Sequence, residues 1–176
     1  MIPGVNHDLT HLADLVHERN AIDAKIATIV GRPPTTGHLG EWIARRVFAI
    51  TEPTSAAERA NDGVFLDGPL QGRTVNIKWY LKREGLLDVS GFDLDHYLVL
   101  TGPPGSSASS KGTTRPMTID AVYLFDHDAL KAQGVKAGTA SSVRAALWNE
   151  AEIYPAHSGV LPVTSEQRES LALFAA

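Results

Sequence analysis

The sequence predicts an α/β fold, in which a central mixed β-sheet of about four to five strands is flanked by α-helices. Two nearly continuous apolar runs, at 96–101 and 119–125, are typical of central strands that are covered on both faces. Apolar residues at helical spacing both precede and follow these runs. Because segments with the apolar spacing of helices lie on both sides of these strand-like runs, we expect a sheet with helices on its faces.

The chain has the size of one domain. It contains 176 residues, of which 43% are hydrophobic and 20% charged, and this composition supports a proper core. We therefore expect a single domain over 1–176, made of an N-terminal helical segment, a core helix with the sheet, and C-terminal helices. These three parts are expected at residues 1–36, 37–125 and 126–176.

Two helices are expected before the sheet. Apolar spacing from about Asp8 to Val30 predicts one long or two short helices, which end at Gly31 and the two prolines that follow. A second helix is expected from about Gly37 to Ile50, with Thr35 or Thr36 as its N-cap.

Within that second helix the apolar residues share one face, whereas His38, Glu41 and Arg45 line another. Glu41 is therefore expected on the polar stripe of a helix that is anchored in the core.

The segment 61–81 predicts a β-hairpin, because a short strand, a Gly/Pro turn and a second strand follow one another. Asp62 lies at the start of this hairpin. In the second strand Asn76 and Lys78 alternate with apolar residues, which places both on the same face about 6.6 Å apart. The opposite face, which includes Trp79, is expected in the core.

The rest of the chain predicts one loop and three helices. Residues 102–116 are rich in Gly, Pro and Ser but lack the order of a phosphate-binding loop. A short helix is expected after Asp126, a longer one from about Ser141 to Tyr154, and a last one that begins at Thr164 with a capping box to Gln167.

Composition narrows the functional classes. The absence of cysteine excludes disulfides, cysteine zinc sites and thiol nucleophiles, and favours a reducing cytoplasm. No stretch is apolar enough to predict a membrane span, and no secretory leader is expected. The net charge of −4 disfavours coating of nucleic acid through the overall field, so any contact with DNA has to be local.

The order of Glu41, Asp62 and the strand residues Asn76-Ile77-Lys78 resembles the PD-(D/E)XK nuclease superfamily, which has the restriction endonuclease-like fold. The resemblance covers roughly residues 37 to 125, and the strand is also similar to those of bacterial domains within that superfamily. It implies a metal-dependent DNA endonuclease that uses Mg²⁺ or Mn²⁺. It further implies homodimers, because nucleases of this fold that cut both strands often work as dimers.

The resemblance assigns a role to each residue. Asp62 is the expected metal ligand, Lys78 acts on the attacking water, and Glu41 is an auxiliary acid that holds a second ion or a metal-bound water. Asn76 stands where the family usually has Asp or Glu, and a neutral amide attracts a divalent cation less strongly. Glu41 or Asp67 can supply the missing charge if either side chain points inward.

This departure keeps other functions open. One alternative is a catalytically inactive nuclease-like domain that binds nucleic acid or a protein partner. Another is a binding module unrelated to nucleic acid, in keeping with the acidic net charge. Lys82, Arg83 and Arg45 are the expected phosphate contacts if nucleic acid is bound.

Each site residue also has a structural interpretation. Asp62 precedes Gly63 in a turn-forming Asn-Asp-Gly sequence, and Lys78 can be a solvated lysine on the outer face of a strand. Glu41 can be a surface residue that pairs with Arg45 one helical turn later.

Three other groups of polar residues are expected to be structural. His7, His11 and His17 have helical spacing that suits a metal, but a polar helix face explains them better. The Asp126-His127-Asp128 trio favours helix capping over acid–base chemistry. Ser106 to Ser110 form part of a loop without the surroundings of a nucleophile.

Overall fold

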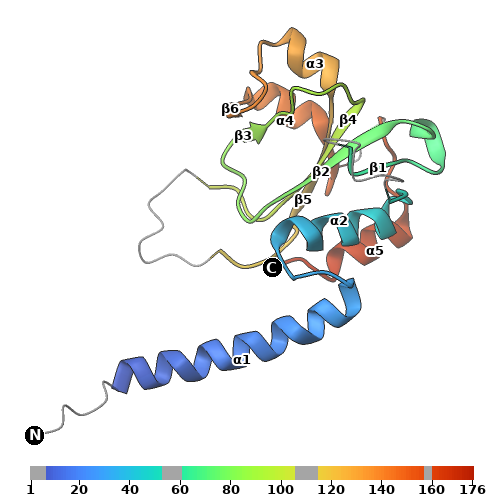
Figure 1. Cartoon of the computed structure of the whole chain (residues 1–176). Helices are drawn as coiled ribbons and strands as arrows, with labels where there is room; N and C mark the ends of the chain where they lie inside the picture. The colour runs from blue at the N-terminus through green and yellow to red at the C-terminus, as the bar shows by residue number, and fades with distance from the viewer. Residues whose placement is uncertain (1–6, 53–60, 106–114, 157–159) are drawn as a thin grey trace, which may run out of the picture.

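The computed structural model describes residues 7–52, 61–105, 115–156 and 160–176. It confirms the predicted α/β fold with a mixed five-stranded sheet and helices on its faces (Figure 1). The elements in chain order are α1 (His7–Val30), α2 (Thr36–Val47), β1 (Gly63–Val64), the 3-10 helix η1 (Gly68–Leu70), β2 (Thr74–Tyr80), β3 (Leu86–Asp88), β4 (His96–Thr101), β5 (Ala121–Asp126), α3 (His127–Ala132), β6 (Ala140–Ser142), α4 (Ala145–Ala151), β7 (Glu152–Tyr154) and α5 (Ser165–Ala172).

The main sheet has the order β1-β2-β4-β5-β7. β1 and β2 form the predicted antiparallel hairpin, with Gly63 opposite Val75. β2 and β4 are parallel, so that Asn76 and Lys78 lie beside Tyr97 and Val99. The remaining pairs, β4 with β5 and β5 with β7, are antiparallel. β3 and β6 form a separate two-stranded ribbon.

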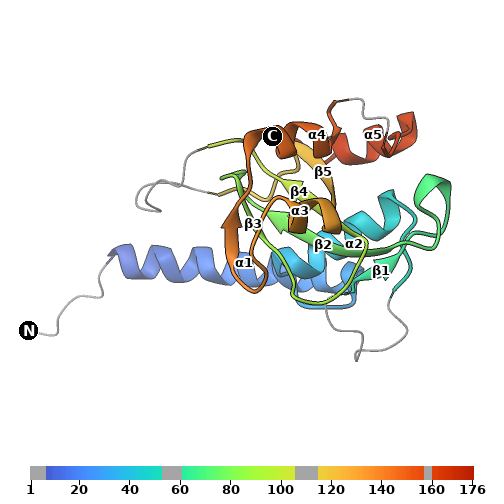
Figure 2. The ribbon, with the colours of Figure 1, turned by 90° about the horizontal axis from the view of Figure 1, so that it is seen from above.

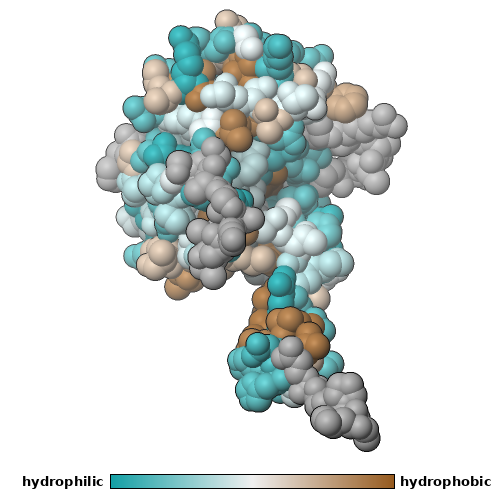
Figure 3. All heavy atoms as spheres, turned by 90° about the vertical axis from the view of Figure 1, so that its left-hand side faces the viewer, coloured by the Kyte–Doolittle hydropathy of each residue, from teal (hydrophilic) through white to brown (hydrophobic). Residues whose placement is uncertain are grey.

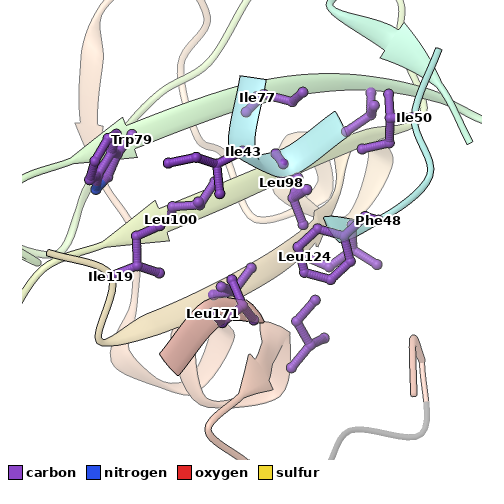
Figure 4. Close-up of a cluster of buried hydrophobic side chains, with 14 of the residues drawn as sticks. Ile43, Phe48, Ile50, Ile77, Trp79, Leu98, Leu100, Ile119, Leu124 and Leu171 are labelled. Atoms are coloured by element: carbon purple, nitrogen blue, oxygen red, sulfur yellow. The ribbon is translucent and has the colours of Figure 1, made fainter. Parts of the chain in front are cut away.

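A core cluster lies on each face of the sheet. On one face α2 and α5 cover the sheet, and apolar residues from β2, β4 and β5 meet those of the two helices (Figures 1 and 4). On the other face a second cluster joins β4 and β5 to residues of β3, α3 and α4 (Figure 2). All six residues of β4 are buried, which confirms that this apolar run is a central strand covered on both faces.

Helix α2 packs against β2 through a glycine. Thr35 caps the helix as expected, and its side chain accepts a hydrogen bond from the backbone N–H of His38. A Cβ atom built on Gly40 would lie 2.8 Å from Cβ of Trp79, which is closer than two such atoms can approach. The glycine therefore sets the short distance between helix and strand, and it places the neighbouring Glu41 beside β2.

The C-terminal region differs from its prediction. The expected helix from Ser141 to Tyr154 was wrong in extent, because only α4 is helical there and β7 follows it directly. Ile153 is almost completely buried beside β5, and Pro155 disfavours a helical conformation at the residue before it. Residues 126–176 thus contain two strands as well as helices, and sheet pairing outweighs the local helical pattern.

Short structural signals were easier to predict. Thr164 and Gln167 form both hydrogen bonds of the expected capping box at α5. Asp126 accepts a hydrogen bond from the backbone N–H of Ala129, which confirms its role as the cap of α3. No helix in the described part of the chain is long and apolar enough to cross a bilayer.

Helix α1 is a single long helix that extends away from the sheet and its covering helices (Figure 1). None of its residues is buried. Only Ile26 and Val30, near its C-terminal end, pack against the first core cluster.

The packing of α2 predicts opposite effects for two glycines of the same helix. Gly40→Ala should lower the free energy of unfolding by about 1–3 kcal/mol, because the added methyl group meets Trp79 in a close-packed core. Gly37→Ala is the matched control, since its Cβ would meet only Thr35 Oγ1 at 4.0 Å. It should raise stability by up to about 1 kcal/mol through helix propensity. Urea unfolding measures both, and equal effects of the two substitutions would contradict this account of the α2–β2 contact.

Candidate active site at the edge of β2

Asp62 directs its carboxylate toward β2. The turn that precedes β1 is made by Asn61, whose Oδ1 accepts a hydrogen bond from the backbone N–H of Gly63. The backbone N–H of Asp62 donates to Val75, and its Oδ2 accepts a 2.7 Å hydrogen bond from the N–H of Ile77. The carboxylate is therefore fixed beside the central residue of the Asn76-Ile77-Lys78 strand, and turn formation does not occupy it.

Gly63 allows this hairpin to lie against the segment that follows α2. Its backbone has a positive φ of 157°, and a Cβ atom there would collide with the carbonyl oxygen of Thr51. Thr51 in turn donates its backbone N–H to Val64 and accepts a hydrogen bond from it through Oγ1. The start of β1 is thus held on both sides, by β2 and by the chain after α2.

Arg45 links the two elements of the site. Its guanidinium donates two hydrogen bonds to the carbonyl oxygen of Asp62, at 2.9 and 3.2 Å, and a third to Glu41 at 3.3 Å. The side chain is only 11% exposed. The predicted pairing of Glu41 with Arg45 is confirmed, and Arg45 anchors the site instead of lying open on the surface.

Glu41 is shared between two arginines. Its Oε2 lies 2.8 Å from Arg32 and 3.3 Å from Arg45. The helical stripe of Glu41 and Arg45 was visible in the sequence. The contact with Arg32 was not, because this residue lies in the segment between α1 and α2, where no local pattern indicates a partner.

The pKa of the Asp62 carboxyl depends on its burial and on the charges of Glu41, Lys78 and Arg45. Burial raises the pKa of the Asp62 carboxyl above its usual value of 3.8, and the nearby negative charge of Glu41 raises it further. The hydrogen bond from Ile77 and the positive charges of Lys78 and Arg45 act in the opposite direction but do not cancel the rise. The rise in the pKa of Asp62 is therefore due mainly to burial, and the charge of Glu41 adds to it.

The face of β2 that carries Asn76 and Lys78 is not the open polar face expected from alternation. Asn76 is 6% exposed and Lys78 has a side chain that is 26% exposed. The reason is that the second core cluster covers this side of the sheet, where Tyr97 and Val99 are their neighbours on β4. Lys78 is therefore not a fully solvated lysine.

Lys78 approaches one residue that the sequence did not indicate. Its Nζ lies 4.0 Å from Oδ2 of Asp88 in β3. The backbone N–H of Asp88 donates to the hydroxyl of Tyr80, and burial raises the pKa of that hydroxyl. β3 has only three residues, too short a pattern to be predicted as a strand.

The donor set is compatible with a hard cation. In the described part of the chain, no three Asp, Glu, His or Cys side chains gather closely enough to hold a metal by themselves. Mg²⁺, however, is usually bound by one or two carboxylates and keeps several waters. Glu41 and Asp62 are two such carboxylates, and they lie near enough for the charge of Glu41 to contribute to the raised pKa of Asp62.

The expected phosphate contacts lie after β2. Lys82 has a side chain that is 22% exposed and lies 3.7 Å from Glu84, which also contacts Arg115. The guanidinium of Arg83 lies 5.9 Å from the ring centre of Tyr123. These cations are not grouped with Arg45, which belongs to the Asp62 anchor.

The other polar groups lie away from the Asp62 site. Asp67 is exposed and flanks η1, in the turn between β1 and β2. His7, His11 and His17 are exposed along α1. His127 is buried against Tyr97, with ring centres 5.7 Å apart. The serines from Ser106 to Ser110 lie outside the described residues.

A scan of the chain against models of known protein families finds no match, and a search of curated proteins finds no significant match either. The function of the site therefore has to be inferred from its own residues.

The raised pKa of Asp62 predicts a pH-dependent effect on stability. A carboxyl with a raised pKa holds its proton more tightly in the folded state, so it stabilises the fold below pH 3.8 and loses that contribution as the pH rises through the folded pKa. Asp62→Asn should therefore be more stable than the unmodified protein near neutral pH, and the difference should shrink as the solution is acidified toward about pH 4.

Urea unfolding at several pH values checks this expectation. Asp67→Asn is the matched control, because it removes an exposed carboxylate from the same hairpin. It should change stability by no more than about 0.5 kcal/mol. A loss of stability in Asp62→Asn at neutral pH would show that Asp62 is a structural residue.

Proposed function

We propose that the protein is a metal-dependent DNA endonuclease of the PD-(D/E)XK type. The observation that supports this most directly is that burial raises the pKa of the Asp62 carboxyl beside β2, and that the charges of Glu41 and Lys78 both act on this carboxyl. Two carboxylates and a lysine are the residue types that hydrolysis of a phosphodiester requires. Since a fold hosts many functions, this proposal rests on the site.

Mg²⁺ or Mn²⁺ is the proposed cofactor, with Asp62 and Glu41 as its carboxylate ligands and Asn76 as a neutral one. When bound, the cation would stabilise the negative charge that develops on the phosphate during the reaction. Asp62 is suited to this task because Ile77 and Arg45 fix both its carboxylate and its backbone.

Lys78 is the proposed residue that acts on water. Hydrolysis forms a bond between a water oxygen and phosphorus and breaks one phosphorus–oxygen ester bond. The attacking water releases one proton to solvent, and the ester oxygen that leaves takes up one proton from solvent, so that the step is balanced. The Lys78 ammonium can donate a hydrogen bond to the attacking water and attract the phosphate by its charge. Partial burial strengthens both interactions, because water competes less in a site of low polarity.

DNA is the proposed substrate, with Lys82 and Arg83 as phosphate contacts. The two follow β2 directly, so a strand of DNA that reaches Lys78 can pass over them. Such local contacts agree with a chain whose net charge is negative. A nuclease of this kind acts inside the cell, which makes the cytoplasm its proposed location.

A catalytically inactive domain that binds nucleic acid or a protein is the second candidate. Two observations support this second candidate. The Oε2 atom of Glu41 already pairs with Arg32 and Arg45, and position 76 carries a neutral side chain.

Metal titration and plasmid nicking on the same samples separate the two candidates. For the enzyme, calorimetry should detect binding of Mn²⁺ or Mg²⁺, and supercoiled plasmid should be nicked when the metal is present. Asp62→Asn should abolish both, because a neutral amide replaces the fixed carboxylate. Lys78→Met should lower nicking by about 100-fold or more while metal binding persists.

Two exposed residues provide matched controls, namely Asp67→Asn for the carboxylate and Lys136→Met for the lysine. Both should retain full binding and nicking. Absence of metal binding and nicking in the unmodified protein would reject the enzyme and favour the inactive domain.

Asn76→Asp tests whether the neutral residue weakens the site. A carboxylate at this buried position should destabilise the metal-free protein, since the transfer of a charge from water to a buried position is unfavourable. Added Mn²⁺ should restore the lost stability by binding the folded state, and metal affinity should rise about tenfold or more. Thermal unfolding with EDTA and with Mn²⁺ measures both effects. A variant that is destabilised equally in the two conditions would place Asn76 outside the metal site.

A further inference from the structure

Helix α1 exposes an apolar stripe that nothing in the described part of the chain covers. Its 24 residues span about 36 Å. Leu12, Leu15, Ile22 and Ile29 are each about half exposed or more, at 47–67%. Apolar side chains gather on this projecting arm in the space-filling view (Figure 3). A stripe of this size on an isolated helix marks a surface for association.

The spacing of the stripe is that of a coiled coil. Alternate steps of three and four residues run through six positions from Leu12 to Ile29, which fills the a and d sites of three successive heptads. Five of the six are apolar, and Arg19 is the exception. The six positions are Leu12, Leu15, Arg19, Ile22, Ile26 and Ile29.

We infer that α1 pairs with α1 of a second copy of this chain as an antiparallel coiled coil. In that arrangement each a position of one helix faces a d position of the other. All six positions of one helix then find a partner among the six positions of the other. The facing pairs are Leu12 with Ile29, Leu15 with Ile26, and Arg19 with Ile22.

The charges beside the stripe select the antiparallel direction. Glu18 and Lys25 both occupy g positions, which face each other across an antiparallel pair. Glu18 of each copy then lies opposite Lys25 of the other, which gives two attractive pairs. A parallel pair would set Arg19 against Arg19 and Glu18 against Asp23, and both contacts join like charges.

The position of α1 leaves room for this partner. Among the described apolar residues of α1, those that pack against the first core cluster are Ile26 and Val30, near its C-terminal end. Ile26 is only partly buried by this contact, and its neighbours in the stripe, Ile22 and Ile29, are 55% and 67% exposed. This association is independent of the chemistry at Asp62, which lies on a different part of the chain.

Sedimentation of the full chain tests the inference. The unmodified protein should be dimeric at about 100 μM and dissociate on dilution, as expected for three heptads. Leu15→Glu should leave only monomer at the same concentration. Because Leu15 is half exposed in the monomer and α1 contains no Trp, Tyr or Phe, the near-UV circular dichroism spectrum of the variant should match that of the unmodified protein.

Charge reversal tests the register. Glu18→Lys and Lys25→Glu should each weaken the dimer by about tenfold or more, because two attractive pairs become repulsive. The double variant with both changes should restore the original affinity. Asp14→Lys, which makes the same change of charge as Glu18→Lys away from the stripe, should have no effect on dimerisation.

Cysteine cross-linking tests the direction, and the absence of natural cysteines makes it specific. A mixture of Leu12→Cys and Ile29→Cys proteins should form a disulfide between the two variants, whereas Ile29→Cys alone should not cross-link. A protein that stays monomeric at about 100 μM would overturn the inference. Cross-linking of Ile29→Cys with itself, or a double charge variant as weak as the single ones, would overturn the antiparallel arrangement.

Discussion

The contact between α2 and β2 is the constraint on which the rest of the site depends. Gly40 lets the helix approach Trp79 more closely than any larger residue would allow. At that distance the next residue, Glu41, and Arg45 one turn later reach the edge of β2. Arg45 then holds the backbone of Asp62, while Ile77 holds its carboxylate. A single close approach in the core therefore determines where Arg45 can bind both Glu41 and the backbone of Asp62.

The same edge holds a carboxyl whose ionised form is destabilised by its surroundings. Burial and the charge of Glu41 raise the pKa of Asp62, so the ionised carboxylate is less favourable here than in water. Two arginines offset part of this charge by binding Glu41 and the carbonyl of Asp62. Carboxyls whose pKa is raised in this way occur preferentially at functional sites.

The two faces of the sheet have separate roles. The face under α2 and α5 contains the first core cluster and positions Glu41 and Arg45. The opposite face, under the second cluster, surrounds Asn76 and Lys78. Because Asp62 lies at the edge of β2, it can interact with charged residues from both faces. Helix α1 belongs to neither layer, and its exposed stripe points to association between chains.

The sequence by itself determined the fold class, the hairpin, the fully buried β4 and the caps at Thr35 and Thr164, because each depends on local periodicity or on residues three apart. The sequence also indicated Glu41, Asp62 and Lys78 as candidate site residues, through their order on a helix and two strands. Only the tertiary structure decided that β7 follows α4, that Asn76 is buried, and that Arg32 and Asp88 approach the site. These features depend on contacts between segments far apart in the chain, which no local pattern encodes.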